Sequence, residues 1–418
     1  MTEAPALAWL LSLADQERGV GWNPRASPDS QWKLGRTRAL LDLAGSPDQR
    51  LKIALVAGTK GKGSTCAMLA SILGTNGVRC GLYTKPHLQT YRERVRVDGQ
   101  AISPESFADS VARIRGLISR LPEAAGEPTT FEVTTALALE YFARQRCEIA
   151  VVEVGLGGRL DATNATEPDL SIITSISYDH TAILGRTLGS IASEKAGILR
   201  AHRPALLADQ RPAAMRALAR ACRAVGADCR VVAPVDVDLP LAGAHQRQNA
   251  ALAMAAARSM RPSITDELIQ IGLQRLRWPG RFELVECDPR VVLDGAHNGA
   301  SAEALAATLR KYAAGRPIAF VLGINRDKDA RAVLRPLLGL ADRVWATQTA
   351  DNPRALPAAE LGRLCRVLGA HAMEEPDIAT ALREAMCSAP GVVCVTGSLM
   401  LVGQARATLG LPPPEQLW

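Results

Sequence analysis

A glycine-rich segment near residue 60 combines a lysine with hydroxyl side chains. It follows the apolar run Ile53–Ala57 and precedes the helix-like run Cys66–Leu73. Glycines let such a turn aim its N–H groups at one point, and the start of a helix adds partial positive charge there. The pattern predicts a loop that binds nucleotide phosphates, and its candidate residues are Gly58, Thr59, Lys60, Gly61, Lys62, Gly63, Ser64 and Thr65.

The spacing of this segment departs from the standard phosphate-loop pattern. That pattern has a glycine, four residues and then Gly-Lys-Ser/Thr, whereas here one residue separates Lys62 from Ser64. The alternative is a lysine-containing glycine turn that binds no ligand. The strand before the segment and the helix after it favour phosphate binding, with Lys62 on a terminal phosphate and Ser64 on its Mg²⁺.

Further charged side chains stand at the ends of later hydrophobic strands. Glu153 interrupts the apolar run Ile149–Val154, and a buried carboxylate is costly unless it is paired or bound to a metal. His180 follows the strand-like run Leu170–Ile176. Because open α/β sheets bind ligands at the carboxyl ends of their strands, we expect Glu153 and His180 to hold Mg²⁺. The alternatives are a structural salt bridge for Glu153 and a structural role for His180.

Two more clusters at strand ends have the composition of ligand sites. The segment Gly155–Asn164 begins with glycines that a ligand can approach closely and continues with Arg159 and Asp161. The segment Asp294–Asn298 lies between a strand and a helix, and its ordinary explanation is a helix N-cap by Asn298. Asp, His and Asn together exceed what capping requires.

The elements that must position these groups alternate between strand-like and helix-like runs. From Leu51 onward most strands are apolar on both faces, which is typical of a doubly wound parallel sheet. The alternation restarts at Arg290–Asp294. We therefore predict an α/β protein, with a P-loop doubly wound parallel-sheet domain over residues 1–285 and a smaller Rossmann-like α/β domain over residues 286–418.

The region before the first strand predicts two helices. They cover Ala4–Gln16 and Leu34–Ala44, and the linker between them, Gly19–Trp32, is rich in glycine, proline and serine. Further along, a threonine in the segment 129–130 is placed to cap the predicted helix Phe131–Arg144.

Composition and charge exclude several classes of protein. The 418 residues suit two or three domains, and 47% hydrophobic with 22% charged residues is ordinary for packed cores. The net charge of +7 comes from scattered basic residues beside only 4% aromatics, which argues against a nucleic-acid surface and suits small anionic substrates. No apolar run approaches membrane-spanning length and no signal peptide is evident, so we expect a cytoplasmic protein without membrane or nucleic-acid partners.

The nine cysteines are odd in number and form no Cys-x-x-Cys pair. This usage predicts free thiols in a reducing cytosol and argues against a disulfide framework or a zinc site.

Taken in order, these pieces resemble the folylpolyglutamate synthase/dihydrofolate synthase family of the Mur-type ligases. The resemblance covers nearly the whole chain and rests most on the stretches Val56–Thr65 and Val151–Asn164. Supporting matches are the segments Tyr83–Leu88, Tyr178–Thr181, Glu194–Ile198, His245–Asn249, Pro279–Phe282, Asp294–Asn298 and Thr396–Ser398.

The resemblance implies an ATP-dependent, ADP-forming ligase that adds L-glutamate to 7,8-dihydropteroate, to tetrahydrofolate polyglutamates, or to both. The acceptor carboxylate would be activated as an acyl phosphate, which the glutamate amine then attacks. The resemblance also implies ATP, one or two Mg²⁺ ions with a monovalent cation left open, small-molecule substrates as the only partners, and a monomer.

The resemblance assigns roles by position in this sequence. Lys62 and Ser64 would hold the ATP phosphates and a first Mg²⁺, and Glu153 and His180 a second, while Lys195 resembles the family's carbamylated lysine. The residues implied at the nucleotide are Asn249, Arg281 and Asp294. The residues implied at the substrates are Phe131 and Asp161 in the pterin pocket and His297 and Ser398 on the glutamate side. The candidate catalytic residues are Lys62, Lys195 and His297.

Two positions depart from the family pattern. The family usually has Asn where Lys60 stands, and it usually has Ser, near the second metal, where Lys85 stands in Tyr-x-Ser-Pro-His. A charged lysine cannot ligate a metal, so we expect Lys85 to replace part of the metal's charge or to contact phosphate.

Two other functions remain open. One is a Mur-type ligase for another carboxylate acceptor, such as a cell-wall nucleotide precursor. Those enzymes usually carry an N-terminal UDP-binding domain, for which residues 1–54 are too few. The other is a nucleotide-dependent regulator without catalysis. The presence of Lys62, Glu153, His180 and Lys195 argues against it.

Overall fold

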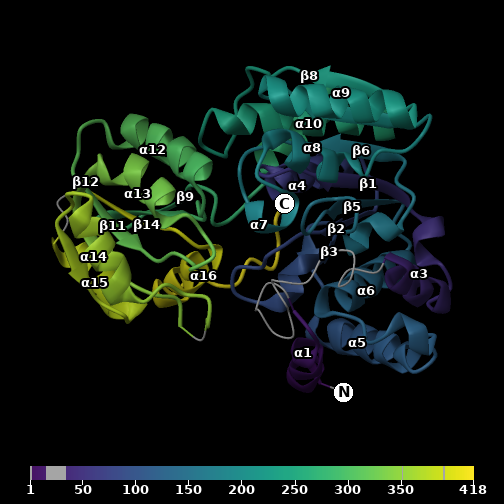
Figure 1. The fold of residues 1–418 in the computed structure, drawn as a ribbon, viewed down its shortest axis with the longest axis horizontal. Helices are drawn as coiled ribbons and strands as arrows, with labels where there is room; N and C mark the ends of the chain where they lie inside the picture. Colours follow the sequence, from purple (N-terminus) through teal and green to yellow (C-terminus); the bar gives the residue numbers. More distant parts are fainter. Residues whose placement is uncertain (1, 16–33, 351, 389–390) are drawn as a thin grey trace.

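The computed structural model describes residues 2–15, 34–350, 352–388 and 391–418, and the expected linker Gly19–Trp32 lies outside them. Figure 1 shows two α/β bodies side by side, one built before residue 280 and one after it. Among the helices of the described residues, none is both long and apolar enough to cross a membrane.

The first body is built on an eight-stranded sheet with the strand order β4-β3-β2-β5-β1-β6-β7-β8. Six neighbouring strands are parallel, namely β2 (Cys80–Tyr83), β5 (Ile149–Glu153), β1 (Lys52–Ala57), β6 (Leu170–Ile173), β7 (Pro204–Ala208) and β8 (Asp228–Val232). The antiparallel edge is formed by β3 (Val95–Val97) and β4 (Gln100–Ala101). The predicted doubly wound parallel sheet is confirmed, with an antiparallel edge added.

Helices cover both faces of this sheet because alternate residues of each strand point to opposite sides. In β1, Ile53 and Leu55 face one cluster of buried side chains, whereas Ala54 and Val56 face another. The first face is covered by α1 (Glu3–Ser12), α3 (Leu34–Leu43), α5 (Pro104–Ile118), α6 (Thr130–Arg144), α8 (Leu188–Ala196) and α9 (Pro212–Val225). The second face is covered by α4 (Lys62–Thr75), α10 (His245–Met260) and α11 (Asp266–Arg275).

The second body is built on a six-stranded sheet with the order β13-β12-β11-β14-β10-β9. Its strands are β9 (Glu283–Val285), β10 (Arg290–Asp294), β11 (Ile318–Leu322), β12 (Ala341–Ala346), β13 (Ala372–Glu374) and β14 (Val392–Thr396). Only β9 is antiparallel, and it pairs with β10, so it belongs to the second sheet although it precedes residue 286.

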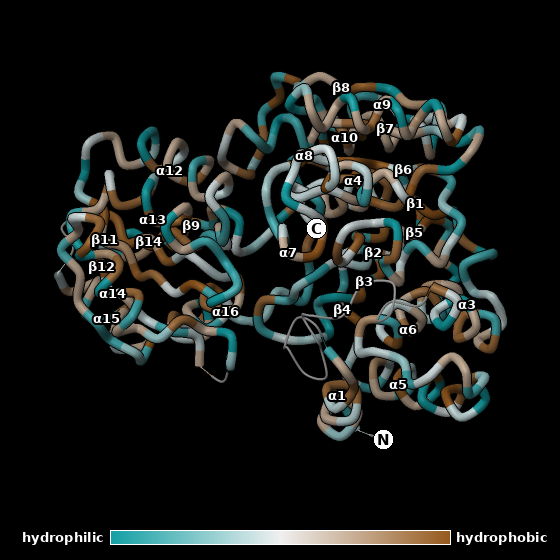
Figure 2. The backbone as a smooth tube through the Cα atoms, in the orientation of Figure 1, coloured by the Kyte–Doolittle hydropathy of each residue, from teal (hydrophilic) through white to brown (hydrophobic). Residues whose placement is uncertain are grey.

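The second sheet is also covered on both faces. One face packs against α12 (Gly299–Ala313), α13 (Ala330–Leu338) and α14 (Ala358–Val367). The other packs against α15 (Ile378–Ser388) and α16 (Leu399–Thr408). Figure 2 shows the apolar residues concentrated along the central strands of both sheets, as expected for strands that are buried on two sides.

One sequence-based expectation about the cysteines is wrong. Cys222, in α9, and Cys229, in β8, form a disulfide across the turn that contains Gly226. The left-handed backbone at Gly226 reverses the chain there and lets α9 run back into β8. The other seven cysteines are free thiols, as predicted.

The last segment of the chain, residues 411–418, returns from α16 to the first body. The N–H of Ala101 donates to the carbonyl of Glu415 at 2.8 Å, and the N–H of Leu417 donates to Gly99 at 3.2 Å. Leu417 is buried in the same apolar cluster as α4 and α10. We call residues 411–418 the C-terminal strap.

Candidate active site

A cavity of about 780 Å³ lies between the two bodies and is lined by residues of both. It contains most of the residues that the sequence indicated: Gly58, Thr59, Lys60, Gly61, Lys62, Gly63, Ser64, Glu153, His180, Lys195, Asn249, Arg281, Asp294, His297 and Ser398. Three predicted residues are not among the described lining residues, namely Thr65, Phe131 and Asp161.

The phosphate loop leaves β1 and is fixed by the neighbouring strand and by α10. The N–H groups of Thr59 and Lys60 donate to the carbonyl of Ser175 at 2.9 and 3.2 Å. Gly61 has φ +81°, and a Cβ there would lie 2.1 Å from Asn249 Oδ1, so this position requires glycine. The loop therefore lies against Asn249, as the resemblance implies for a residue at the nucleotide.

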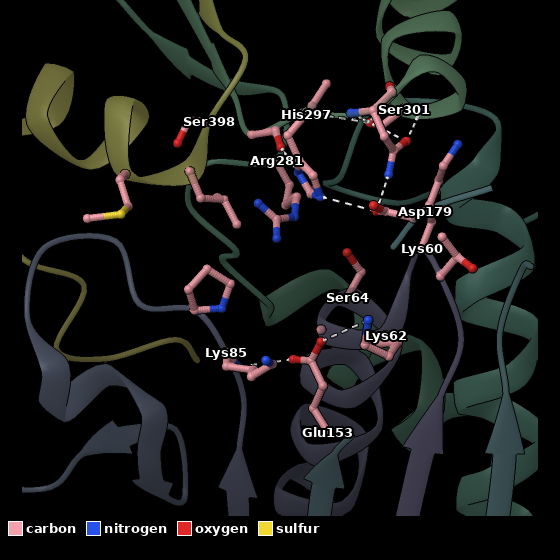
Figure 3. Close-up of a pocket in the computed structure, with 18 of the residues that line it drawn as sticks. Lys60, Lys62, Ser64, Lys85, Glu153, Asp179, Arg281, His297, Ser301 and Ser398 are labelled. Atoms are coloured by element: carbon pink, nitrogen blue, oxygen red, sulfur yellow. Dashed lines mark hydrogen bonds and ion pairs between the residues drawn. The ribbon is translucent and has the colours of Figure 1, made fainter. Parts of the chain in front are cut away.

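Lys62 begins α4 and faces the carboxylate at the end of β5. Lys62 Nζ lies 3.8 Å from Glu153 Oε1, and the N–H of Lys85 donates to Glu153 Oε2 at 3.1 Å (Figure 3). Burial raises the pKa of Glu153, while the positive charge of Lys62 opposes that rise. The salt bridge considered as the alternative for Glu153 is thus present. Figure 3 also shows Ser64 beside these groups in the cavity.

Lys195 lies beneath the phosphate loop. It stands near the end of α8, is buried, and its Nζ donates to the carbonyl of Gly58 at 2.9 Å. The end of α8 packs closely against the turn that contains Gly158. A Cβ at Gly158 would lie 2.7 Å from the carbonyl of Glu194, so this position needs glycine. Burial, with the nearby charge of Lys62, lowers the pKa of Lys195 to about 7. Lys195 is therefore a buried residue of the site and not a surface lysine of α8.

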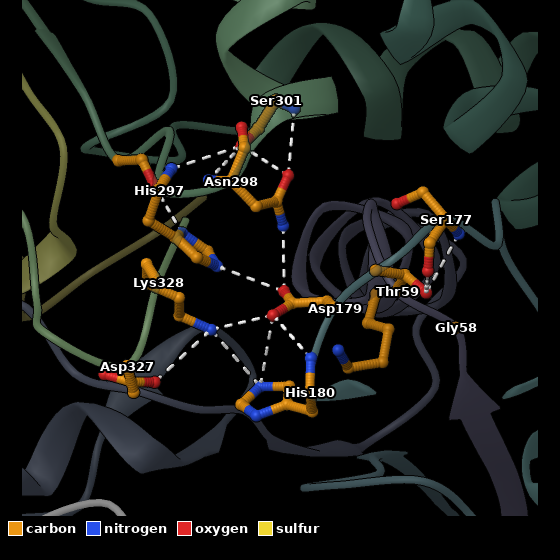
Figure 4. Close-up of polar contacts among 12 residues, drawn as sticks. Gly58, Thr59, Ser177, Asp179, His180, His297, Asn298, Ser301, Asp327 and Lys328 are labelled. Carbon is orange, nitrogen blue, oxygen red and sulfur yellow. Dashed lines mark hydrogen bonds and ion pairs between the residues drawn. The ribbon is translucent and has the colours of Figure 1, made fainter. Parts of the chain in front are cut away.

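A polar network around Asp179 joins the two bodies along one side of the cavity. Its carboxylate accepts hydrogen bonds from Lys328 Nζ and Asn298 Nδ2, each at 2.8 Å (Figure 4). Both partners belong to the second body. His180 lies beside this pair, with its Nε2 3.4 Å from Lys328 Nζ. Burial lowers the pKa of His180 to about 3, so the ring is neutral and Nε2 can accept from the ammonium.

The segment Asp294–Asn298 forms the second body's side of the cavity. Asn298 caps α12, because its Oδ1 accepts from the N–H of Ser301 at 3.0 Å, and the ordinary explanation is confirmed. His297 Nδ1 donates to the carbonyl of Gly295 at 2.8 Å, which leaves Nε2 as an acceptor. Burial, with the charge of Lys328 nearby, lowers the pKa of His297 to about 4.

Arg281 enters the cavity from the connection between α11 and β9. Burial lowers the pKa of its guanidinium, against the opposing charges of Asp294 and Glu153. Asp294 is held at the end of β10, where its carboxylate accepts from the N–H groups of Phe282 at 2.8 Å and Ala296 at 2.9 Å. Arg281 thus presents positive charge between the two bodies.

Phe131 and Asp161 lie behind the turn at Gly155. A Cβ at Gly155 would lie 2.7 Å from Phe131 and 2.8 Å from Asp161 Oδ2. The Asp161 carboxylate accepts from the N–H of Leu156 at 2.8 Å and from Thr163, whose 3-10 turn it caps. Asp161 therefore shapes this turn.

Sequence reasoning missed two members of the Asp179 network. Lys328 was overlooked although Asp327-Lys-Asp329 follows the apolar strand β11, the same strand-end signal that indicated Glu153. Asp179 was noted only as part of the segment Tyr178–Thr181. The network could not be found from the sequence, because Asp179 and Lys328 are 149 residues apart.

The residues present fit one Mg²⁺ bound together with nucleotide phosphates. The Ser64 hydroxyl stands at the start of α4 and lines the cavity beside Lys62, and oxygen donors are what Mg²⁺ prefers. They do not fit a second divalent ion on Glu153 and His180. Among the described residues no three Asp, Glu, His or Cys side chains converge as metal ligands, and an ammonium already faces each of these two groups.

Two family models match the chain. Residues 56–230 match the middle domain of the Mur ligases, and residues 280–399 match the Mur ligase glutamate ligase domain. The first match begins just before the phosphate loop, and the second begins at Gly280, beside Arg281.

Curated proteins and solved structures are similar to this chain over most of its length. The chain is 35% identical to a dihydrofolate synthase/folylpolyglutamate synthase of Bacillus subtilis, over 90% of this chain and 94% of that protein. E. coli FolC in complex with DHPP and ADP is 30% identical with a TM-score of 0.86, and the match covers 98% of each chain. The bifunctional folylpolyglutamate synthase/dihydrofolate synthase of Yersinia pestis c092, complexed with AMPPNP and Mn ion, is 32% identical with a TM-score of 0.85 over 98% of each chain.

Proposed function

This chain belongs to the Mur ligase family, and from that premise we propose how its cavity joins L-glutamate to a folate carboxylate. It is an ATP-dependent, ADP-forming acid–amino acid ligase of the dihydrofolate synthase/folylpolyglutamate synthase type. The acceptors are 7,8-dihydropteroate, tetrahydrofolate polyglutamates, or both. The observation that carries the proposal is that a phosphate loop and a glutamate-ligase body face each other across one cavity.

In the first step, a carboxylate oxygen of the acceptor attacks the γ-phosphorus of ATP. The new O–P bond gives an acyl phosphate, and the broken bond releases ADP. Lys62 and the N–H groups at the start of α4 are placed to stabilise the negative charge that moves onto the leaving phosphate. Lys60 adds charge at the same loop, although burial lowers its pKa to about 8. A Mg²⁺ held at Ser64 would supply positive charge to the phosphate oxygens.

In the second step, the amine of glutamate attacks the acyl carbon and phosphate leaves. The amine must first lose a proton, since glutamate enters as an ammonium. His297 is neutral, and its Nε2, which lies 3.9 Å from Asp179 Oδ2, is an acceptor, so we assign it the hydrogen bond from that ammonium. Ser398 stands at the N-terminus of α16, where partial positive charge suits a glutamate carboxylate.

We propose that Lys195 is carbamylated. A pKa of about 7 leaves much of its amine neutral at physiological pH, and the neutral amine adds to the carbon of CO₂ with loss of one proton. The product is an anion next to the ammonium of Lys62, which now lowers the pKa of Lys195 by repulsion. Carbamylation would therefore turn a repulsive pair into an attractive one.

The remaining assignments combine position at the cavity with family membership. We propose Asn249, Arg281 and Asp294 at the nucleotide, since all three line the cavity near the loop. Phe131 and Asp161 are proposed to support the pterin pocket from behind Gly155.

We further propose the two domains 1–285 and 286–418, with β9 (Glu283–Val285) moved to the second domain because it pairs with β10. We propose a monomer, because one chain supplies both walls of the cavity. A cytoplasmic location is supported by the seven free thiols, whereas the Cys222–Cys229 disulfide counts against it.

The experiment is phosphate release with MgATP and L-glutamate, using 7,8-dihydropteroate and tetrahydrofolate as separate acceptors. Release with both acceptors means two activities, and release with one identifies which is present. Lys62→Ala should abolish turnover and leave folding intact, and normal turnover in that variant would refute the phosphate-loop assignment. Release with neither acceptor, in folded protein that binds ATP, would favour a Mur-type ligase for another carboxylate.

A further inference from the structure

A short loop of the first body is folded around one buried carboxylate. Glu93, which is only 6% exposed, lies three residues beyond this loop. Its carboxylate accepts hydrogen bonds from the N–H groups of Leu88 at 2.9 Å, Gln89 at 2.8 Å and Thr90 at 2.7 Å. Successive N–H groups that converge on one anion fix the backbone that carries them. The conformation of this loop, residues 88–90, therefore depends on Glu93.

The same loop packs directly against α16 of the second body. A Cβ at Gly403, in α16, would lie 1.9 Å from the carbonyl oxygen of Leu88, so the two backbones touch and only glycine fits. The Leu88 side chain packs against the apolar cluster that the second sheet forms with α15 and α16. Leu88 thus belongs to the first body by its strand connections and to the second body by its packing.

Gln89 adds two side-chain hydrogen bonds to this contact. Its Oε1 accepts from Arg406 Nε at 2.9 Å, and its Nε2 donates to the carbonyl of Leu411, the first residue of the C-terminal strap, at 3.0 Å. Arg406 is buried in α16 and forms an ion pair with Glu283. The loop is therefore joined to α16 by backbone packing at Gly403 and by hydrogen bonds one turn later.

The helix that this loop contacts begins at the cavity. Ser398 is the N-cap of α16 and lines the cavity, on the side of α16 that Figure 3 shows. Gly403 lies five residues further along, which is about 7.5 Å at the rise of an α-helix. Because a helix moves as a rigid unit over this length, a displacement of α16 at Gly403 also displaces Ser398.

We propose that Glu93 is a positioning residue for the glutamate side of the reaction. By fixing residues 88–90, it sets where α16, and with it Ser398, stands at the cavity. The inference rests on the proposed function in one respect, which is the assignment of Ser398 to a glutamate carboxylate. Glu93 is not among the described residues that line the cavity, so it acts through the loop and the helix.

The test replaces Glu93 by glutamine. Glutamine keeps one oxygen for two of the three N–H groups, but it places an NH₂ donor opposite the third. In Glu93→Gln we expect the KM for glutamate to rise about 10-fold, since a misplacement of about 1 Å costs about 100-fold and the shift here is smaller. The KM for ATP should stay unchanged, because the phosphate loop keeps its contacts. Phosphate release measures both values.

Gly403→Ala displaces the same contact from the helix side, because its Cβ would meet the carbonyl of Leu88. It should also raise the KM for glutamate. Since both changes break one contact, their effects in the double variant should not multiply. If circular dichroism shows that Glu93→Gln does not fold, Gln89→Ala serves, because it removes only the two side-chain hydrogen bonds to α16 and the strap.

Asp48→Asn is the matched control. Asp48 is also 6% exposed, and its carboxylate pairs with Arg38 within the first body. This variant should lower stability and leave the KM for glutamate unchanged. An equal rise of that KM in Asp48→Asn and Glu93→Gln would overturn the inference, because general loosening would then explain both.

Hydrogen exchange distinguishes failure of the inference from failure of the proposed function. In Glu93→Gln we expect faster exchange at the N–H of Leu88 and along α16, with exchange in α13 unchanged. Unchanged exchange in α16 would overturn the inference, and so would faster exchange with a wild-type KM for glutamate. If the wild type released phosphate with no acceptor, the proposed function would fail, while faster exchange confined to the loop and α16 would still support the connection from Glu93 to Ser398.

Discussion

The two bodies are joined by contacts of two different kinds. The C-terminal strap lies against β3 and β4, where Arg96 donates to the carbonyls of Pro414 at 2.6 Å and Glu415 at 2.9 Å. On the other side of the interface, Asp179 meets Lys328 and Asn298 through side chains alone. The strap contact is buried and uses backbone acceptors, whereas the Asp179 contact lines the substrate cavity.

We infer that the two contacts have different functions. The strap holds the two bodies together, and the Asp179 network controls whether substrates can enter the cavity. A guanidinium bonded to backbone carbonyls cannot exchange partners without exposing them unpaired, so the strap is the fixed contact. Side chains that line a cavity can exchange each other for water or substrate. We therefore expect the bodies to open at Asp179 and to stay attached at the strap.

The largest effect should come from Arg96→Met. Arg96 is almost fully buried and also donates to the carbonyls of Glu93 and Gly99, so the change removes four buried hydrogen bonds. The carbonyls of Glu415 and Gly99 keep the N–H groups of Ala101 and Leu417 as donors, whereas Glu93 and Pro414 lose their bond from the guanidinium. We expect a loss of about 4 kcal/mol in the free energy of unfolding, measured in urea, since each unpaired buried group costs about 1–3 kcal/mol. The KM for glutamate should change little below the transition.

Arg113→Met is the control for this prediction, because Arg113 is half exposed and pairs with Asp109, one turn earlier in its own helix. It should lower stability by less than about 0.5 kcal/mol. A similar loss in the free energy of unfolding of the two variants would mean that the strap contact stabilises the protein no more than an exposed ion pair does.

The next effect should come from Asp179→Ala, which breaks the other contact. Lys328 and Asn298 lose their partner, and the second body is no longer held at the cavity. We expect kcat/KM for glutamate to fall about 100-fold, because small misplacements of catalytic groups cost that much. The urea transition should move little, since the strap is intact.

Asp236→Asn is the matched control for this variant, because it alters an exposed carboxylate with an arginine partner at 2.8 Å. If Asp179→Ala lowered stability as much as Arg96→Met does, the Asp179 network would be a second fixed contact and the distinction would be wrong.

A smaller effect is expected from acid. Burial and Lys328 lower the pKa of His297 to about 4, whereas a histidine in water has a pKa of about 6.5. Between these values the separated state binds more protons than the closed state, so lowering the pH from 6.5 towards 4 favours opening. Small-angle scattering should show a larger radius of gyration at pH 5 than at pH 7.5.

The variant Asp179→Ala supplies the reference for the acid experiment. Asp179→Ala should already be open at pH 7.5 and show little further change at pH 5. A radius of gyration that stays constant in the wild type over this range would show that the closed state does not depend on neutral His297.

Much of the fold could be predicted because buried parallel strands leave long apolar runs between polar turns. The bounds of β10 agree with the predicted run Arg290–Asp294 to the residue. The short strand β13 and the helix α15 were not predicted. The three residues of β13 are partly exposed and show no clear alternation of apolar and polar side chains. The Cys222–Cys229 pair was also missed, because its geometry depends on the turn at Gly226.

The candidate site was predictable where one segment carries the chemistry. The phosphate loop was found because it directly follows an apolar strand. Glu153 was found because it interrupts one. Lys328 was not, because its partner Asp179 lies on a different body and only the tertiary structure brings them together. Asp161 was read as a ligand residue, although an Asp two residues before a Thr is also typical of a local cap, which it forms here.

The smallest effect should come from Glu415→Gln, and it tests what makes the strap a fixed contact. Glu415 Oε1 lies 2.7 Å from Arg92 Nη2, but its side chain is 41% exposed, so the ion pair is screened by water. The carbonyl of Glu415, which accepts from Arg96 and Ala101, is unchanged in this variant. We expect a loss of about 0.5 kcal/mol in urea unfolding, as for other exposed pairs. A loss as large as that of Arg96→Met would show that charge pairing, and not burial of backbone acceptors, holds the strap in place.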